Sequence, residues 1–318
     1  GSQQARLYPN PRYDGVFAIW YGKWPGVDRS CDALKHGNYA GAAAKGGVLA
    51  LCGDDPGAKS SSIAHCSEQA LVHLGMPMLN PSSVQDYLDF GIAGWELSRY
   101  SGCWIGMKCL TDTVESGASV HVGHDRVQVV RPTDFPMPDG GLNIGFVTGG
   151  LLGVEERLFH RRLPAAQAFV RANGLDRVAI EAPRKRVGIV TTGKAYLDVR
   201  QALEELGIDE QRAADQGLSI YKVAMSWPLE PVNARAFCTG HEEVLVVEEK
   251  RSFIEQQLAR VLYDLPDAER PKLLGKRDAD GAPLVSDVGE LSPGDVVAAL
   301  RRWLGRAAPE LVADARPA

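Results

Sequence analysis

The most informative stretch of this chain is Val48-Leu-Ala-Leu-Cys-Gly-Asp-Asp-Pro-Gly-Ala-Lys-Ser-Ser61. An apolar run reaches a glycine and an acidic turn, and Lys59 and Ser60 follow where a helix is expected to begin. In a parallel sheet, such a layout presents backbone N–H groups and a helix N-terminus at the carboxyl edge, where cofactors commonly bind. Three kinds of site fit this pattern: an ATPase phosphate loop, a metal–diphosphate site, and one wall of a larger cofactor site.

The first two kinds of site match poorly. An ATPase loop needs a second glycine directly before its lysine, but Ala58 occupies that position and two aspartates would repel a triphosphate. Gly53-Asp-Asp55 with Asn80 imitates the Gly-Asp-Gly…Asn motif that binds magnesium in thiamine-diphosphate enzymes, but Asp55 stands where glycine is expected. A turn followed by a helix cap accounts for the same residues equally well.

Composition limits the classes of protein. The chain has 318 residues, is 45% hydrophobic and carries a net charge of −5, so we expect about two domains and no nucleic-acid partner. It has no signal peptide and no 18-residue apolar segment, so we expect no membrane association. The six cysteines show no C-x-x-C pair and no metal-ligand spacing, which indicates a reducing, cytoplasmic compartment and no metal site.

Short apolar runs alternate with amphipathic stretches along the chain, a pattern that predicts parallel sheets covered by helices. In the first half we expect strands over residues 15–20, 48–52, 76–79 and 104–110, and a helix from residue 84 to residue 95 that begins at a Ser82–Gln85 capping box. The fold class is therefore α/β, with two doubly wound, mainly parallel-sheet domains. The predicted boundaries are a first module at 1–130, a linker with a surface helix at 131–185, and a second module at 186–318.

Both modules resemble one family of enzymes. Lys35-His-Gly-Asn38, the run from Gly46 to Pro56, and Pro77-Met-Leu-Asn-Pro81 are similar to the pyrimidine-binding module of 2-oxoacid:ferredoxin oxidoreductases, and above all to the fused, indolepyruvate type. Independently, Arg186–Tyr196 and Val244–Glu249 resemble the transketolase-C-like domain of the same family. Trp24 and Cys31 depart from the pattern, because the family carries glycine there.

The resemblance implies an activity that needs more than this chain. Family members use thiamine diphosphate and magnesium to decarboxylate a 2-oxo acid oxidatively, form an acyl-CoA and reduce ferredoxin through iron–sulfur clusters. The implied substrate is indolepyruvate or a related aryl 2-oxo acid. In the family, the activating glutamate, the diphosphate module, the cluster cysteines and the coenzyme A site all lie outside the matched region.

We therefore expect a central fragment or a split subunit that is inactive alone and works with the remaining domains or subunits and with ferredoxin. A homo-oligomer is also expected. The alternative is a non-catalytic interaction or assembly module for a separate catalytic chain.

The resemblance also nominates site residues. Lys35 and His36 are expected on a glycine-rich loop that faces the active-site cleft, as catalytic residues: lysine would hold a substrate or cofactor anion and histidine would move a proton. For His36, a solvated loop position fits equally well. The expected cofactor-binding residues, on the wall formed by the opening stretch, are Gly53, Asp54, Asp55, Ser60 and Ser61. Aspartates in such turns commonly accept backbone N–H groups.

Overall fold

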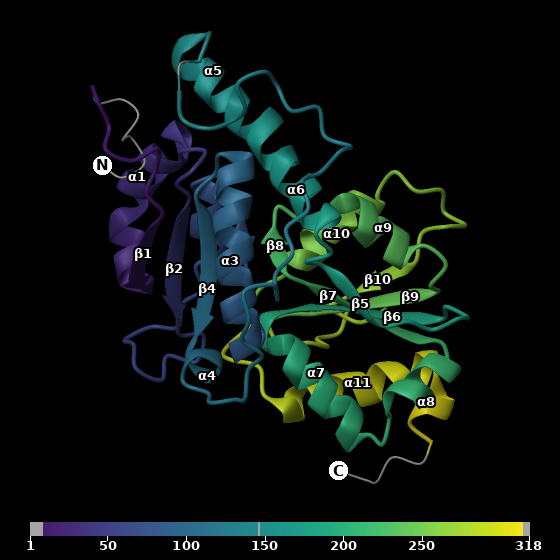
Figure 1. Cartoon of the computed structure of the whole chain (residues 1–318). Helices are drawn as coiled ribbons and strands as arrows, with labels where there is room; N and C mark the ends of the chain where they lie inside the picture. Colours follow the sequence, from purple (N-terminus) through teal and green to yellow (C-terminus); the bar gives the residue numbers. More distant parts are fainter. Residues whose placement is uncertain (1–8, 146, 314–318) are drawn as a thin grey trace. The chain divides into compact units, whose positions relative to one another are not determined.

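The computed structural model describes residues 9–145 and 147–313, which form two compact units (Figure 1). Unit 1 contains the chain up to Asp55, together with His65–Leu175 and Met225–Glu230. Unit 2 contains Pro56–Ala64, Asp176–Ala224 and the chain from Pro231 onward. Each unit holds one five-stranded sheet with helices around it, which confirms the predicted α/β class.

The sheet of unit 1 has the order β1-β2-β4-β3-β8. Its strands are β1 (Ala18–Lys23), β2 (Val48–Asp54), β4 (Ile105–Leu110), β3 (Met78–Leu79) and β8 (Met225–Trp227). The first four run parallel and β8 pairs antiparallel with β3. The four strands expected in the first half are all present, with boundaries shifted by a few residues. The register places Cys52 opposite Lys108 and Asp54 opposite Leu110. Asp54 and Lys108 therefore lie near the carboxyl ends of two neighbouring strands.

Four helices of unit 1 are α1 (Trp24–Ala40), α2 (Glu68–His73), α3 (Val84–Ser101) and α4 (Thr111–Val114). The predicted helix at residue 84 is α3, but its cap differs from the prediction by one residue. Ser83 is the N-cap and its side chain accepts from the backbone of Asp86, while Ser82 donates its hydroxyl to the Asp86 carboxylate. Asp86 takes part in both hydrogen bonds because it is the third residue after the N-cap Ser83.

A further helical run consists of α5 (Gly150–Arg157), a π-helical turn (Leu158–Arg162) and α6 (Leu163–Ala172). The surface helix predicted within residues 131–185 is present as this helical run, which the π turn interrupts just before Pro164. The helical run packs within unit 1, where α6 contacts α3, whereas β5 (Arg177–Ile180) joins the sheet of unit 2. The segment predicted as a separate linker, residues 131–185, is therefore divided between the two units.

Arg162 ties this helical run to α1. Its side chain is 1% exposed and donates to the carbonyls of Asn38 (3.0 Å), Tyr39 (2.9 Å) and Ala40 (3.2 Å), and to that of Leu142 (2.8 Å). The last carbonyls of a helix have no partner within the helix, so one guanidinium satisfies the end of α1. Burial lowers the pKa of Arg162 to about 10.

The sheet of unit 2 has the order β10-β9-β6-β7-β5. Besides β5, its strands are β10 (Lys272–Leu274), β9 (Glu243–Val247), β6 (Val187–Thr192) and β7 (Leu218–Val223). All pairs are parallel except β5 with β7. Chain order reverses between β6 and β9, and this reversal makes the unit doubly wound.

Helices cover both faces of this second sheet (Figure 1). One face carries α7 (Gly193–Glu205) and α11 (Pro293–Ala307), which pack on each other, and the other carries α9 (Pro231–Cys238) and α10 (Ile254–Leu262). A short helix, α8 (Glu210–Asp215), and a 3-10 turn (Pro309–Leu311) complete the unit. A capping box between Ser292 and Asp295 begins α11.

Replacing Arg162 by methionine should destabilise unit 1 strongly. Four carbonyls lose their donor in a buried environment, and a loss of about 2–4 kcal/mol in the free energy of unfolding is expected. Urea denaturation followed by circular dichroism measures the effect, and Arg161→Met is the matched control because Arg161 is exposed. Equal stability of the two variants would contradict the capping role.

Candidate functional site

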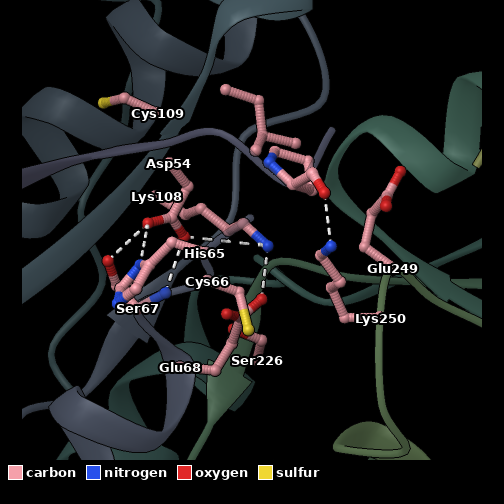
Figure 2. A network of polar contacts seen from close by, with 12 residues as sticks. Asp54, His65, Cys66, Ser67, Glu68, Lys108, Cys109, Ser226, Glu249 and Lys250 are labelled. Carbon is pink, nitrogen blue, oxygen red and sulfur yellow. Dashed lines mark hydrogen bonds and ion pairs between the residues drawn. The ribbon is translucent and has the colours of Figure 1, made fainter. Parts of the chain in front are cut away.

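A buried charged cluster lies where β2 and β4 end in unit 1. Asp54, the last residue of β2, is 2% exposed. Its carboxylate accepts hydrogen bonds from the backbone N–H of Ser67 (2.8 Å) and from the Ser67 hydroxyl (2.5 Å), as Figure 2 shows. Ser67 is the N-cap of α2, so Asp54 joins the end of the strand to the start of the helix. The expectation that aspartate accepts N–H groups in this region is confirmed for Asp54.

Lys108 supplies the positive charge of the cluster. It lies on β4 with 1% of its surface exposed, pairs with the carboxylate of Glu68 at the start of α2, and lies 4.0 Å from Asp54 Oδ2 (Figure 2). Within the described part of the chain, Glu68 Oε2 has no hydrogen-bond partner. One buried ammonium therefore faces two carboxylates, and one carboxylate oxygen is left for a further donor.

The charges of this cluster depend on one another. Burial alone would lower the pKa of Lys108, but the carboxylates of Glu68 and Asp54 outweigh that effect and hold the pKa well above its usual value. Burial would likewise raise the pKa of Glu68, yet Lys108 brings it below its usual value. Both residues therefore remain ionised in the fold, and either would be costly to bury without the other.

His65 connects the cluster to the start of α1. Its Nδ1 lies 3.5 Å from Asp54 Oδ1 and its Nε2 lies 3.4 Å from Asp28 Oδ1. The imidazole stacks on the Trp24 ring at a centroid distance of 4.6 Å. The Asp54 carboxylate beside Nδ1 raises the pKa of His65 despite partial burial, and the charge of Asp28 adds to that rise. The imidazolium is therefore the form that this position favours.

The thiols beside the cluster are poor nucleophiles. Burial raises the pKa of Cys66 to about 12 and that of Cys109 to about 11. Thiolates, the reactive form of cysteine, are therefore scarce here near neutral pH. All six cysteines of the chain lie among the described residues, where each is a free thiol.

The residues predicted for the cofactor wall belong to both units. Gly53 and Asp54 end β2 and Asp55 follows, buried, whereas Ser60 and Ser61 lie in the segment that belongs to unit 2. The expected helix at Lys59 and Ser60 is wrong, because the first helix after β2 is α2 at Glu68. The backbone of Ala58 opposes a helix there, because its φ of +55° lies outside the right-handed helical region. The side chain of Lys59 pairs with Glu290 at 2.8 Å.

The predicted loop around Lys35 and His36 is also wrong, because both residues lie inside α1. Gly37 does not break this helix; a Cβ there would lie 2.3 Å from the Trp104 ring, so the glycine allows close packing. Lys35 Nζ lies 5.8 Å from the centre of the Tyr39 ring, and His36 Nδ1 lies 2.9 Å from the Asp32 carbonyl oxygen. These described interactions stay within α1, and the catalytic role of Lys35 and His36 stays a prediction.

The residues present do not fit a magnesium–diphosphate site. The Asp54 carboxylate is already bound by Ser67 and faces Lys108. Asn80, which follows β3, is 5% exposed and its Oδ1 has no hydrogen-bond partner among the described residues. In residues 9–145 and 147–313, no three His, Cys, Asp or Glu side chains are grouped to hold a metal ion. The geometry favours the turn-and-cap interpretation of these residues.

Sequence reasoning missed Lys108, Glu68 and His65 as members of this site. A signal for Lys108 was available, since it interrupts the apolar run 104–110 that predicts a buried strand. A lysine in a buried strand needs a carboxylate partner. Nothing in the local pattern identifies Glu68 as that partner, because the two residues meet only through the packing of α2 against β4.

At the same edge of the second sheet, Glu248 caps a helix. It follows β9 and accepts the backbone N–H groups of Phe253 (2.9 Å), Ile254 (2.7 Å) and Glu255 (3.1 Å) at the start of α10. Burial raises the pKa of Glu248 to about 7, although these N–H groups and Lys276 act in the opposite direction. The N-terminus of α10 is thus filled by the protein's own carboxylate.

Replacing Lys108 by methionine should cost about 3–5 kcal/mol of stability, because the Glu68 carboxylate is left buried without its cation and the Asp54 carboxylate keeps only His65 beside it. Adding Glu68→Gln removes one of those charges and should restore part of the loss. Denaturant unfolding of the wild type, both single variants and the double variant gives the coupling energy. Strictly additive losses would contradict a direct Lys108–Glu68 interaction.

The raised pKa of His65 predicts a pH dependence. A folded-state pKa above the unfolded value gives stability that is fully present below about pH 6.5 and is lost as pH rises through the folded pKa. The free energy of unfolding should therefore fall more between pH 6 and pH 9 in the wild type than in His65→Gln. His124→Gln is the control, since His124 is exposed; parallel pH profiles for wild type and His65→Gln would disprove the coupling.

Known protein families and sequences match both units of this chain, and the matched family domain begins where the chain returns to unit 2. The family model of the indolepyruvate ferredoxin oxidoreductase middle domain matches residues 176–316, and unit 2 takes up the chain at Asp176. Indolepyruvate oxidoreductase subunit IorA of Methanothermobacter marburgensis is 24% identical over 78% of this chain and 38% of its own length. IorA of Pyrococcus abyssi is 26% identical over 93% of this chain and 43% of its own length. The chain thus spans about two fifths of these relatives.

Two solved structures share the fold. A split-gene transketolase, described as an inactive beta4 tetramer, aligns with a TM-score of 0.53 and 15% identity over 92% of this chain and 77% of its own. The 2-oxoglutarate:ferredoxin oxidoreductase from Magnetococcus marinus, solved with 2-oxoglutarate, coenzyme A and succinyl-CoA, aligns with a TM-score of 0.54 and 13% identity over 89% and 52%. At these identities the likeness concerns the fold alone. The family model and the IorA relatives confirm the resemblance in the sequence: residues 176–316 match the indolepyruvate ferredoxin oxidoreductase middle domain, and most of the chain is similar to IorA subunits.

Proposed function

We propose that this chain is the central part of a thiamine-diphosphate-dependent enzyme that oxidatively decarboxylates indolepyruvate or a related aryl 2-oxo acid to acyl-CoA, with ferredoxin as electron acceptor. The family model and the IorA relatives support the class of enzyme. The observation that carries the proposal is the ionised cluster of Asp54, Glu68 and Lys108 at the carboxyl edge of a parallel sheet. Ligands of open α/β sheets bind at that edge.

The cluster acts by positioning rather than by chemistry of its own. Asp54 and Lys108 together hold the end of β2 against the start of α2, so the turn between them keeps one conformation. Thiamine diphosphate, when bound, supplies the carbanion stabilisation that decarboxylation needs. A pyrimidine-binding module contributes a rigid wall to such a site, and we propose this role for unit 1, with Gly53 to Asp55 at the wall.

Other parts of the enzyme must supply what this chain lacks. The described residues do not fit magnesium and diphosphate, so we place that half of the cofactor site, the iron–sulfur cluster and the coenzyme A site in the remaining domains or subunits. The chain alone is then inactive and depends on those partners and on ferredoxin. Among the described helices, none is long and apolar enough to cross a membrane. We also propose that the enzyme works in the cytoplasm and that it forms a homo-oligomer.

The decisive experiment is an assay of the full-length enzyme for thiamine-diphosphate-dependent reduction of ferredoxin by indolepyruvate. Turnover that requires both the 2-oxo acid and the cofactor is expected. Absence of turnover with every aryl 2-oxo acid tried would overturn the proposed activity and favour an assembly module.

Lys35→Met in that full-length enzyme tests the role of this lysine. If Lys35 holds a substrate or cofactor anion, one charge-assisted contact is lost, about 1.5–3 kcal/mol, and the kinetic constant it serves falls roughly tenfold to over a hundredfold. Lys272→Met is the control, an exposed lysine on the edge strand β10. Unchanged kcat and KM in Lys35→Met would leave the enzyme assignment intact and return Lys35 to a solvated helix position.

A further inference from the structure

Unit 1 contains a cavity at the opposite edge of its sheet from the charged cluster. The cavity has a volume of about 620 Å³ and is bounded by α3, α6 and the segment 129–143. The position of the cavity follows from Arg99, which lines it. Arg99 Nε donates to the Gly46 carbonyl at 2.8 Å, and Gly46 lies just before β2 begins. The cavity is therefore at the amino edge, whereas Asp54 ends the same strand at the carboxyl edge.

Cations exceed anions in the lining of this cavity. Its charged residues are Lys45, Arg99, Arg131 and Glu96. Lys45 pairs with Asp14 at 2.7 Å, and Arg99 Nη1 pairs with Glu96 at 2.5 Å. Among the described residues, Arg131 has no hydrogen-bond or ion-pair partner, and Arg99 Nη2 has none either. The guanidinium groups of Arg99 and Arg131 thus line one cavity and keep N–H donors that no other described residue accepts.

The remaining wall is largely apolar and aromatic. Tyr100, Phe169, Met137 and Val129 line it, and the rings of Tyr100 and Phe169 pack with centroids 5.7 Å apart. The Tyr100 hydroxyl is buried and, in the described part of the chain, has no hydrogen-bond partner. Buried hydroxyl groups normally find a partner, so this group also indicates a ligand that brings an acceptor.

We propose that this cavity binds a small aromatic carboxylate. A carboxylate matches the planar fork of guanidinium donors from Arg131 and Arg99, and the Tyr100 hydroxyl donates to it. The aromatic body of the ligand packs against Phe169 and Met137, since ligand pockets combine apolar walls with a few converging polar groups. The site is independent of the proposed enzymatic function, because it uses none of the residues of the carboxyl edge.

Isothermal titration calorimetry of the 318-residue chain with phenylacetate tests the proposal. Saturable binding is expected, at least tenfold tighter than that of phenylacetamide, which has the same shape without the charge, and of acetate, which lacks the ring. Equal affinity for phenylacetate and phenylacetamide would overturn the guanidinium role. Equal affinity for phenylacetate and acetate, or no detectable phenylacetate binding, would overturn the site.

Two variants locate the binding. Arg131→Gln should weaken phenylacetate binding about tenfold, the loss of one charge-assisted hydrogen bond, and Arg131 is exposed, so the fold should tolerate the change. Tyr100→Phe should weaken binding several-fold and confirm which hydroxyl donates. Arg161→Gln, an exposed arginine outside the cavity, is the matched control. Wild-type affinity in Arg131→Gln, or an equal loss in Arg161→Gln, would show that the anion binds elsewhere.

Discussion

The burial of one ammonium group between two carboxylates is the constraint on which the carboxyl edge of unit 1 depends. Lys108 is 1% exposed, and its charge is tolerable only because Glu68 and Asp54 face it. That requirement fixes the start of α2 against the ends of β2 and β4. Electrostatic contacts and hydrogen bonds therefore join the end of β2 to the start of α2, in addition to the apolar packing of the buried Leu71.

Arg162 plays the corresponding part at the other end of α1. A guanidinium can donate to several carbonyls at once because its N–H groups point in different directions within one plane. Arg162 donates to the carbonyls of the last turn of α1 and to that of Leu142. Gly41 belongs to the same arrangement: it has φ +100°, and a Cβ there would lie 2.2 Å from the guanidinium. The π turn that ends at Arg162 therefore connects α6 to the helix that carries Lys35 and His36.

Both edges of the first sheet carry polar groups, but of different kinds. At the carboxyl edge, the contacts among Asp54, Glu68, Lys108 and Ser67 pair the charges within the protein, apart from Glu68 Oε2. At the amino edge, Arg131 and one nitrogen of Arg99 have donors without a partner in the described part of the chain, beside aromatic rings. In our proposals, the first arrangement supports a cofactor site and the second binds an anion.

The α/β class, the main strands of the first sheet, the long helix α3 and the family resemblance were predictable from the sequence, because each depends on local apolar periodicity or on contiguous motifs. Asp54 was also found locally, since it ends a strand in an acidic turn. The helical position of Lys35 and His36, the place of Ser60 and Ser61 in unit 2, and the meeting of Lys108 with Glu68 emerged only from the folded chain. Local sequence predicts that Gly37 breaks a helix, whereas in the fold the missing side chain makes room for the Trp104 ring. The ion pair between Lys108 and Glu68 joins residues forty positions apart, so it forms only when α2 packs against β4.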